Sequence, residues 1–577
     1  GYIALFVGAF IIFNTFSIVV AQRTREFGLL RAMGATGSQI LRAVVIESAI
    51  VGVVASLIGL GAGALIAVGL QNLLRAFGSD LPSTTLQFQP RTIVVAMLVG
   101  VGVTMLASIA PARRAARISP MAALREASPQ TTRWSRRRMF AGGGLTAAGI
   151  GLLALGLFGD PGNPAAIVGL GAAVVFFGVA SLSPLFAGPL ARAIGAPMTR
   201  LFHMPGKLAR NNADRNPKRT ASTAAALMIG LALISMVGIL AATIKASTTA
   251  IIDENLKADF IISNTGTAGP VPFSPEIARD LAQKPELAAV SPLRYKEFRF
   301  EGRQQFIGGV DPATIGEVTD LGVEQGAVED ISDGGLLIAD AVASDEGLEV
   351  GDTVEVNLST TGIQEMTVDG IFANVEIVGP PFLVSLETWA QNFDDELDTT
   401  VYAVAAEGVS TSEARTAVEA TTADFPNVDV ENQAEFRDKQ AASIDQLLGL
   451  ITALLSLALL IGVLGITNTL ALSVFERTRE LGLLRAVGMS RRQARAMVRW
   501  EAVIIAIIGA LLGLAVGTFF GWALVQALAD DGLSELAFPV GQLVTYVVLA
   551  GVAGVLAALP PARRAARLNV LQAISQE

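Results

Sequence analysis

The 577-residue chain contains no cysteine and a single histidine, His203, and aromatic residues make up only 6% of it. The absence of cysteine excludes disulfide bonds and thiolate metal sites, and one histidine cannot build a metal site by itself. A Ser-His-Asp triad is also excluded from the acidic segment 247–440, which contains no histidine. The sequence therefore predicts neither catalytic residues nor metal ligands.

The chain also lacks the phosphate-binding motif G-x-x-x-x-G-K-[ST]. Its nearest Gly-Lys pair, Gly206-Lys207, is followed by leucine and has no glycine at the required upstream position. Without that loop, the backbone amides that cradle the phosphates of a nucleotide are missing. We therefore expect this chain to bind no cofactor of its own, so that ATP and Mg²⁺ would be bound by a partner.

Apolar residues, in contrast, are abundant: 52% of the chain is hydrophobic and 16% is charged, which is too apolar for an ordinary soluble protein. Nine stretches are long enough to cross about 30 Å of hydrocarbon. These predicted spans are residues 1–21, 41–75, 92–112, 142–158, 164–195, 218–246, 442–475, 496–528 and 541–562. The pattern predicts a polytopic α-helical membrane protein.

Charge is distributed unevenly along the chain. The net charge is −9, yet acids gather in residues 247–440 and the remainder is basic. Threading the nine spans alternately puts every basic cluster on one side, which the positive-inside tendency assigns to the cytoplasm. The acidic segment and Gly1 then lie outside, and the C-terminus lies in the cytoplasm. The abundance of Ala, Gly and Arg is typical of a GC-rich bacterium, so we expect a bacterial plasma membrane.

One charged segment occurs twice, each time between long apolar runs. It reads "AQRTREFGLLRAMGATGSQ" at residues 21–39 and "ERTRELGLLRAVGMSRRQ" at residues 476–493. The motif "PARRAAR" then ends the third span of each set, at residues 111–117 and 561–567. Chance does not produce such agreement, so the two halves are internal duplicates. The second half also has a span and an external domain before its repeat, and we expect their counterparts to be missing from the first half.

Turn and capping residues in the repeated segment predict a short helix followed by a second helix. Gly34 and Gly488 suit the position just past a helix C-terminus, where a left-handed backbone is common. Thr36 with Gln39, and Ser490 with Gln493, fit the capping box that begins a helix. Each segment is therefore predicted to be a helix, a sharp turn and a capped start of the next membrane helix.

The identity of the repeated residues argues for a specific partner. In the second copy, Leu481, Leu484 and Val487 recur at three-residue spacing, which predicts an apolar stripe on a helix lying along the cytoplasmic face. A simple membrane anchor needs basic residues anywhere, whereas here Arg-Thr-Arg-Glu and a glycine recur at fixed places. We favour docking on a cytoplasmic partner over anchoring alone.

Polar residues inside the predicted spans are few. Asn14 and Asn468 occupy the same place in the two halves, as do Glu47 and Glu501. Such groups are candidates for function by default. We favour helix–helix hydrogen bonding for the asparagines and snorkelling towards arginine for the glutamates.

The segment 250–438 reads as a mixed α/β domain. Strands are predicted at "ADFIIS", "RYKEFRFEG", "TTVYAVAAE" and "NVDVEN", helices at 274–290 and 410–425, and an inserted β-rich piece at "GDTVEVNL" and "EMTVDGIF". The acidic run "DDELD" at 394–398 lacks the spacing and glycine of an EF-hand loop. We expect it to be a solvated loop.

The repeated segment and the long helix after it resemble the signature of FtsX/MacB-type permeases, the membrane subunits of type VII ABC transporters. The resemblance covers essentially the whole chain and includes the arginine-rich stretch "LARNNADRNPKRTAST" at 208–223. It implies duplicated three-helix FtsX-type units, here of a ten-helix form without its first helix and first external domain. It also implies a Porter/Sabre-like fold for the external α/β domain.

In this family the repeated segments are coupling helices that dock on the ATPase. The resemblance places them at 22–35 and 476–489. The implied docking residues are Arg23, Thr24, Arg25, Glu26, Leu29, Arg31 and Gly34 in the first copy, and Arg477, Thr478, Arg479, Glu480, Leu483, Arg485 and Gly488 in the second.

Five regions follow from this assignment. Residues 1–130 form the first permease unit, 131–200 a central hairpin, 201–249 a basic cytoplasmic stretch with its membrane helix, 250–440 the extracytoplasmic domain and 441–577 the second permease unit.

The function implied is that of a permease subunit that works with two copies of a separate ATPase. It would couple ATP hydrolysis to export or extraction of a hydrophobic or lipid-like substrate, or to movement of its external domain. One alternative is a mechanotransmitter that regulates a cell-wall hydrolase or senses a peptide without moving cargo. Another, of a different class, is an ion-coupled secondary transporter. Membrane lipid and an extracytoplasmic protein are the further expected partners, and nucleic acid is not one.

Overall fold

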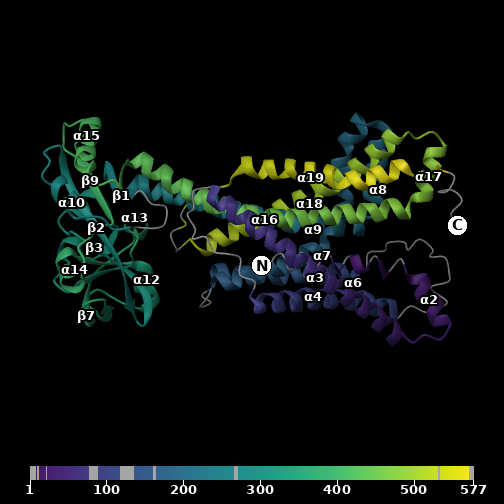
Figure 1. Cartoon of the computed structure of the whole chain (residues 1–577), viewed down its shortest axis with the longest axis horizontal. Helices are drawn as coiled ribbons and strands as arrows, with labels where there is room; N and C mark the ends of the chain where they lie inside the picture. The colour runs from purple at the N-terminus through teal and green to yellow at the C-terminus, as the bar shows by residue number, and fades with distance from the viewer. Residues whose placement is uncertain are drawn as a thin grey trace.

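The computed structural model describes residues 8–9, 12–13, 15–17, 19–20, 23–76, 89–116, 136–159, 164–264, 271–529, 533 and 535–570. The molecule is elongated, with an α/β domain at one end and long helices along the rest (Figure 1). Eight helices in the described part of the chain are long and apolar enough to cross a membrane. The first predicted span, 1–21, falls largely outside the described residues.

The long helices agree with eight of the nine predicted spans. They are α3 (Gly37–Ala76), α4 (Pro90–Ala116), α6 (Arg136–Phe158), α7 (Pro164–Leu201), α9 (Pro217–Asn255), α16 (Gln433–Glu476), α18 (Arg491–Ala527) and α19 (Val540–Arg567). Three shorter helices lie at the end away from the α/β domain: α2 (Thr24–Ala32), α8 (His203–Arg215) and α17 (Thr478–Ala486). The fold is therefore that of a polytopic helical membrane protein with an α/β domain.

Helices α9 and α18 pack closely because α18 presents glycines to α9. Gly509, Gly513, Gly517 and Gly521 recur at every fourth residue and are all buried. A Cβ added at Gly517 would lie 2.3 Å from the carbonyl oxygen of Ala232 on α9. Small residues at this spacing let two backbones approach closely within a membrane, where packing rather than the hydrophobic effect holds helices together.

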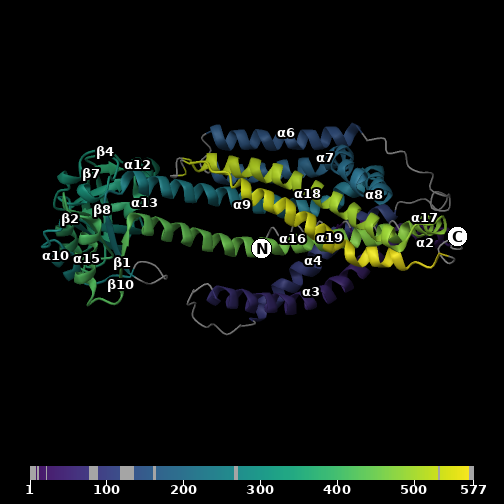
Figure 2. The same cartoon turned by 90° about the horizontal axis from the view of Figure 1, so that it is seen from above.

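Two hairpins flank this centre on opposite sides, α3–α4 on one and α6–α7 on the other (Figure 2). Helix α7 packs on α8, α9 and α18, whereas α3 packs mainly on α4. Only 6% of the most apolar 18-residue window of α3 is buried, against 61% for α18. The two copies of this helix therefore have different surroundings in the described structure.

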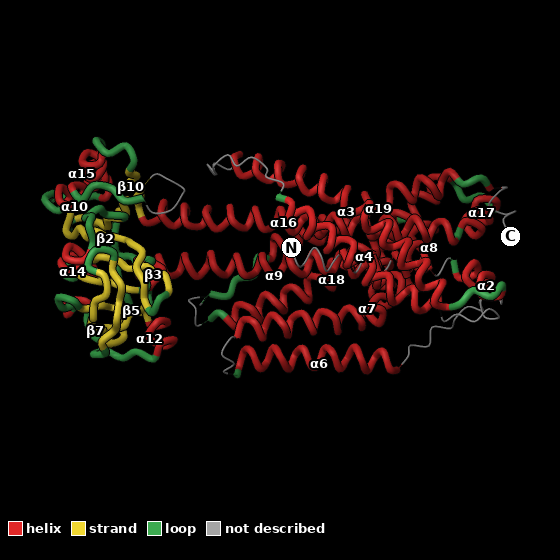
Figure 3. Tube along the Cα trace, turned by 60° about the horizontal axis from the view of Figure 1, so that its bottom comes forward, coloured by secondary structure: helices red, strands yellow, loops and turns green. Residues whose placement is uncertain are grey.

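The α/β domain is built on one ten-stranded sheet (Figure 3), whose main order is β10-β1-β9-β2-β3-β8-β5-β7-β4, with β6 pairing with β2 and β7. Its strands are β1 (Phe260–Asn264), β2 (Leu287–Phe300), β3 (Arg303–Val310), β4 (Val323–Gln325), β5 (Gly335–Ala339), β6 (Thr353–Leu358), β7 (Gly362–Phe372), β8 (Phe382–Ser385), β9 (Thr400–Ala405) and β10 (Val428–Asn432). Its helices are α10 (Glu276–Leu281), α11 (Ile315–Val318), α12 (Asp340–Glu346), α13 (Val375–Val378), α14 (Leu386–Asn392) and α15 (Thr411–Thr422).

The predicted strands of this domain are all confirmed, but the predicted helix at 274–290 is too long. It ends after Leu281 as α10, and its last residues belong to β2, which begins at Leu287. Pro285 explains the change, because the residue before a proline disfavours the helical backbone and proline itself donates no hydrogen bond.

The expectation of a solvated loop holds for residues 394–397, of which Asp394, Glu396 and Leu397 are exposed, but it is wrong for Asp398. The side chain of Asp398 is 1% exposed and accepts a hydrogen bond from Arg294 Nε at 3.1 Å. Its backbone forms a β-bridge with Phe273. Burial raises the pKa of Asp398 to about 6, against the opposing effect of Arg294. Two further ion pairs fix the segment: Lys296–Asp395 at 2.5 Å and Arg279–Glu396 at 3.0 Å.

Candidate functional site

The two copies of the repeated segment lie at the end of the molecule opposite the α/β domain (Figure 1). Helix α2 has the sequence TREFGLLRA and α17 the sequence TRELGLLRA, and both are nine residues long. Each is followed by the predicted glycine, with φ of 103° at Gly34 and 113° at Gly488. Both values are in the left-handed region that favours glycine, which confirms the predicted turn.

The predicted capping boxes are also present in both copies. The Thr36 backbone N–H donates to Gln39 Oε1 at 2.8 Å, and the Gln39 N–H donates back to Thr36 Oγ1 at 3.3 Å. Ser490 and Gln493 make the same reciprocal pair at 2.8 and 3.2 Å. These bonds satisfy backbone donors that a helix start leaves free, and they fix the direction in which α3 and α18 leave the turn.

One face of each repeated helix is packed against the membrane helices. In the second copy this face is formed by Leu481, which is 3% exposed and joins a buried cluster that includes Val474, Val498 and Ala562. In the first copy Phe27 takes the place of Leu481, within a cluster of the equivalent residues Val20, Val44 and Ala112. The duplication thus extends from the sequence to the packing that seats each helix.

The opposite face leaves large apolar side chains exposed. Met33 is 76% exposed and the equivalent Val487 is 88% exposed, and Leu29 and Leu483 are about half exposed. The predicted stripe through Leu481 and Val487 is therefore wrong. A three-residue spacing falls short of the 3.6-residue turn, so two such steps rotate away from the packed face.

In the first copy, one arginine joins the repeated helix to α3. Arg23 donates from Nε to Glu26 Oε2 at 3.0 Å and from Nη1 to Glu47 Oε2 at 2.8 Å. These two carboxylates, Glu26 first, raise the pKa of Arg23 above its ordinary value. Glu47 is half exposed, so the interpretation that it turns towards a nearby arginine agrees with its position.

In the second copy, the same residues are joined through α8. Arg477 donates from Nε to Glu480 at 2.6 Å and from Nη2 to Asn212 Oδ1 at 2.6 Å. The amide of Asn212 then donates to Glu501 Oε2 at 3.0 Å. Glu501 is only 8% exposed, so the interpretation of a snorkelling side chain is wrong at this position, because Asn212 satisfies the carboxylate inside the protein.

Other arginines of α8 and of the start of α9 extend this connection. Arg219 donates to Glu476 Oε2 at 2.8 Å and to the carbonyl of Thr469 at 2.7 Å, both on α16. Arg215 lies 3.9 Å from Glu480 on α17. This basic stretch is evident in the sequence, but its role in holding α16, α17 and α18 together is not. The pair Asn211-Asn212 among arginines was the available signal.

The remaining predicted docking residues differ in what they contact. Arg31 donates to the carbonyl of Ala116 at 3.2 Å, and Arg485 donates to that of Leu568, so both hold the end of a neighbouring helix. Thr478 donates back into its own chain, to Phe475. Arg479 is exposed. The side chains of Thr24 and Arg25 lie outside what the structure describes.

Among the described residues, a polar side chain of one span contacts the other half of the chain. Asn468 Nδ2 on α16 donates to Thr15 Oγ1 at 3.3 Å. This contact confirms the interpretation of Asn468 as a helix–helix hydrogen-bonding residue. Asn14 lies outside the described residues.

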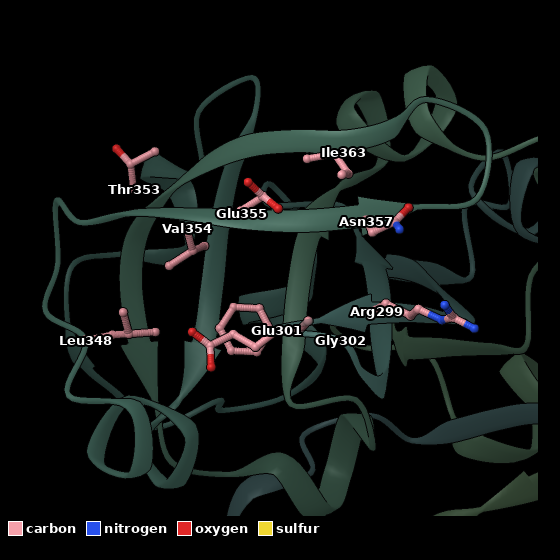
Figure 4. A pocket seen from close by; sticks show the side chains of 10 residues that line it. Arg299, Glu301, Gly302, Leu348, Thr353, Val354, Glu355, Asn357 and Ile363 are labelled. Carbon is pink, nitrogen blue, oxygen red and sulfur yellow. The ribbon is translucent and has the colours of Figure 1, made fainter.

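The described part of the α/β domain contains more than one cavity. One of about 580 Å³ lies along β6 and the β2–β3 turn. Its charged side chains, Arg299, Glu301 and Glu355, are spread around the opening rather than converging on a point (Figure 4). In the described part of the chain no group of three or more His, Asp or Glu residues could hold a metal ion.

The structure is that of a multi-pass membrane protein with two equivalent short helices at one end and an α/β domain at the other. The FtsX-like permease C-terminal family matches residues 1–120 and 452–570, and the MacB-like periplasmic core domain matches residues 220–421. The chain belongs to the FtsX/MacB-type permeases of ABC transporters, a family whose members work with an ABC ATPase.

Relatives agree with this assignment. An uncharacterised ABC transporter permease of Mycobacterium tuberculosis is 23% identical over 600 aligned positions, covering 100% of this chain and 69% of that protein. A macrolide export ATP-binding/permease protein MacB of Hahella chejuensis is 34% identical over 22% of this chain and 19% of its own length. A pyoverdine export ATP-binding/permease protein of Pseudomonas fluorescens is 35% identical over 25% of this chain and 20% of its own length.

Among solved structures, the extracellular domain of the ABC-type transporter YknZ from Gram-positive bacteria is 16% identical, with a TM-score of 0.24, covering 30% of this chain and 99% of that domain.

Proposed function

We propose that two ATPase subunits dock on this permease, one on α2 and one on α17. ATP hydrolysis on these subunits would move the α/β domain. That movement would drive export or extraction of a hydrophobic or lipid-like substrate. The α/β domain would lie outside the cell and both repeated helices, with the C-terminus, in the cytoplasm. The arginine clusters at the end that carries α2 and α17 support this orientation.

The observation that carries the proposal is the pair of exposed apolar patches, Leu29 with Met33 and Leu483 with Val487. Each patch is centred on a helix whose other face packs in an equivalent buried cluster, and each helix is followed by an equivalent capping box. Large apolar side chains on rigid, repeated elements are typical of protein interaction sites. Two such patches related by the duplication fit two copies of one partner.

Movement would reach the α/β domain through α9 and α16. Both helices begin or end at the arginine connection around α8 and continue to the sheet. At the domain, the amide of Gln433 on α16 donates to the carbonyl of Leu256, the residue after α9, at 3.0 Å. This continuous connection also fits the second candidate, a mechanotransmitter whose α/β domain acts on an external protein without moving cargo.

Co-purification with the cognate ATPase tests the docking step. The tagged permease is co-expressed with the ATPase and purified as wild type, as Met33→Glu, as Val487→Glu and as the double variant. A new carboxylate desolvated in an apolar interface is costly, so each single variant should retain one ATPase per chain and the double variant should lose both, with at least a tenfold fall in associated ATPase activity.

Val350→Glu is the matched control, because Val350 is an exposed valine in the α/β domain. It should leave the stoichiometry of the complex unchanged. Retention of two ATPase subunits by the double variant would overturn the docking proposal. Once the complex is purified, stimulation of its ATPase activity by added lipid-like compounds would favour transport. Movement of the domain on ATP addition without such stimulation would favour mechanotransmission.

A further inference from the structure

A second cavity, of about 380 Å³, lies where the α/β domain meets the start of α16. One wall is a single face of α16, because Phe436, Lys439, Gln440 and Ser443 recur at helical spacing. The other wall is formed by the sheet and α13, through residues that include Leu293, Tyr295, Val378, Thr400 and Tyr402. The size is within the range of pockets that bind small molecules.

The lining of this cavity is amphipathic. Leu293, Val378 and Phe436 supply apolar surface, and the half-buried ring of Tyr295 stacks on Phe306 with ring centres 5.0 Å apart. The hydroxyl of Tyr402 is already engaged, since it donates to the carbonyl of Ile377 at 3.0 Å. This part of the cavity therefore offers an apolar and aromatic surface for a ligand.

The polar end of the cavity carries an excess of negative charge. Glu431 is only 6% exposed, and its Oε1 lies 2.5 Å from Lys439 Nζ. The same ammonium lies 3.8 Å from Asp429 Oδ2, so one cation serves two carboxylates. Glu431 Oε2 has no hydrogen-bond partner in the described part of the structure. A buried carboxylate oxygen without a donor is costly, and a further cation would relieve that cost.

We propose that this cavity binds an amphipathic amine, with its apolar part between Tyr295 and Phe436 and its ammonium at Glu431. The incoming ammonium competes with Lys439 for the carboxylate. Because Lys439 is on α16 and Glu431 is on β10, the exchange replaces an ion pair between helix and sheet with one to the ligand. Binding therefore acts directly on the helix that runs to α17, and this inference is independent of the proposed docking of ATPase subunits.

Fluorescence of dansylcadaverine tests the proposal, because its dansyl group brightens in an apolar site and its other end is a primary ammonium. The full chain is placed in phosphatidylcholine nanodiscs, and empty nanodiscs provide the membrane background. We expect saturable binding, at least tenfold tighter than that of dansyl-aminocaproic acid, which carries a carboxylate instead of the amine. Ser443→Trp, which fills the cavity from α16, should abolish the saturable signal.

Two variants should move the affinity in opposite directions. Glu431→Gln removes the ligand's counter-charge and should weaken dansylcadaverine binding at least tenfold. Lys439→Met removes the competing ammonium and should strengthen binding several-fold. If the Glu431–Lys439 ion pair had only a structural role, both variants would change the affinity in the same direction. That result would overturn the proposal. Glu419→Gln, an exposed control on α15, should leave binding unchanged, and a signal equal to that of empty nanodiscs would also reject the site.

Discussion

Helices α3 and α18 begin with the same repeated turn, yet their small-residue faces meet different surroundings. On α18, Gly513 and Gly517 lie against the backbone of α9. The equivalent positions of α3 are Gly59 and Gly63, and a Cβ added at either would meet nothing within 4 Å in the described structure. Each half therefore carries the pattern for close helix packing, but only in the second half is the packing partner seen.

Some features of the duplicated unit are determined by adjacent residues, and others depend on distant elements. The short helix, its turn and its cap depend on residues within one segment, and they are the same in both halves. The environment of the long helix depends on other elements, and it differs. A membrane tolerates this difference because lipid covers an apolar helix about as well as another helix does.

The largest expected effect comes from adding one methyl group at the glycines. Gly517→Ala should destabilise the protein by about 3 kcal/mol, because its Cβ would lie 2.3 Å from the Ala232 carbonyl oxygen, and backbone must move. Gly63→Ala should stabilise it by up to about 1 kcal/mol, since alanine favours a helix over glycine. Thermal unfolding followed by tryptophan fluorescence in detergent gives both values. Equal losses of stability in the two variants would contradict this difference between the halves. They would indicate that α3 is covered in the same way as α18.

A smaller effect is expected at the connection that only the second half has. Asn212→Leu should destabilise the protein by about 2 kcal/mol, because Arg477 and the buried Glu501 both lose a hydrogen-bond partner. Asn211→Leu is the matched control and should change stability by less than about 0.5 kcal/mol. The same unfolding assay measures both. No loss in Asn212→Leu would mean that Arg477 reaches Glu501 directly, as Arg23 reaches Glu47.

The smallest effect is expected at the hydrogen bond between the halves. Asn468→Val and Thr15→Val should each cost less than about 1 kcal/mol, and a double-mutant cycle should return a coupling of about 0.6 kcal/mol, which is typical of such bonds between membrane helices. Thr469→Val serves as a control, since Thr469 bonds within its own helix, to the carbonyl of Gly465. Additive losses would show that the halves are not coupled through Asn468.

The sequence predicted best what is determined locally. The short helices, the left-handed Gly34 and Gly488 and both capping boxes follow from a few adjacent residues, and each prediction is confirmed. Eight spans and the strands of the α/β domain were predicted from length and periodicity. The exposed face of α17 was not, because three-residue spacing alone does not show which side of a helix is packed.

Contacts between distant residues could not be predicted in this way. Asn212 and Glu501 are 289 residues apart, and nothing in either segment indicates that they meet. Asp398 was assigned to a solvated loop because four neighbouring residues include three acids, yet Arg294 and the β-bridge to Phe273 bury it. The Gly509–Gly521 spacing was visible in the sequence, whereas its partner α9 required the structure.

The absence of proline after the first residue of α9, and throughout α16, has a mechanical consequence. Helix α7, by contrast, contains three prolines after its first residue. At 1.5 Å per residue a helix of this kind is a stiff rod about 60 Å long, so a tilt of about 5° at one end displaces the other by about 5 Å. In the proposed coupling, the paired rods would act as levers of nearly equal length. A small rotation at the arginines around α8 would then displace the sheet by a distance comparable to the spacing between two strands.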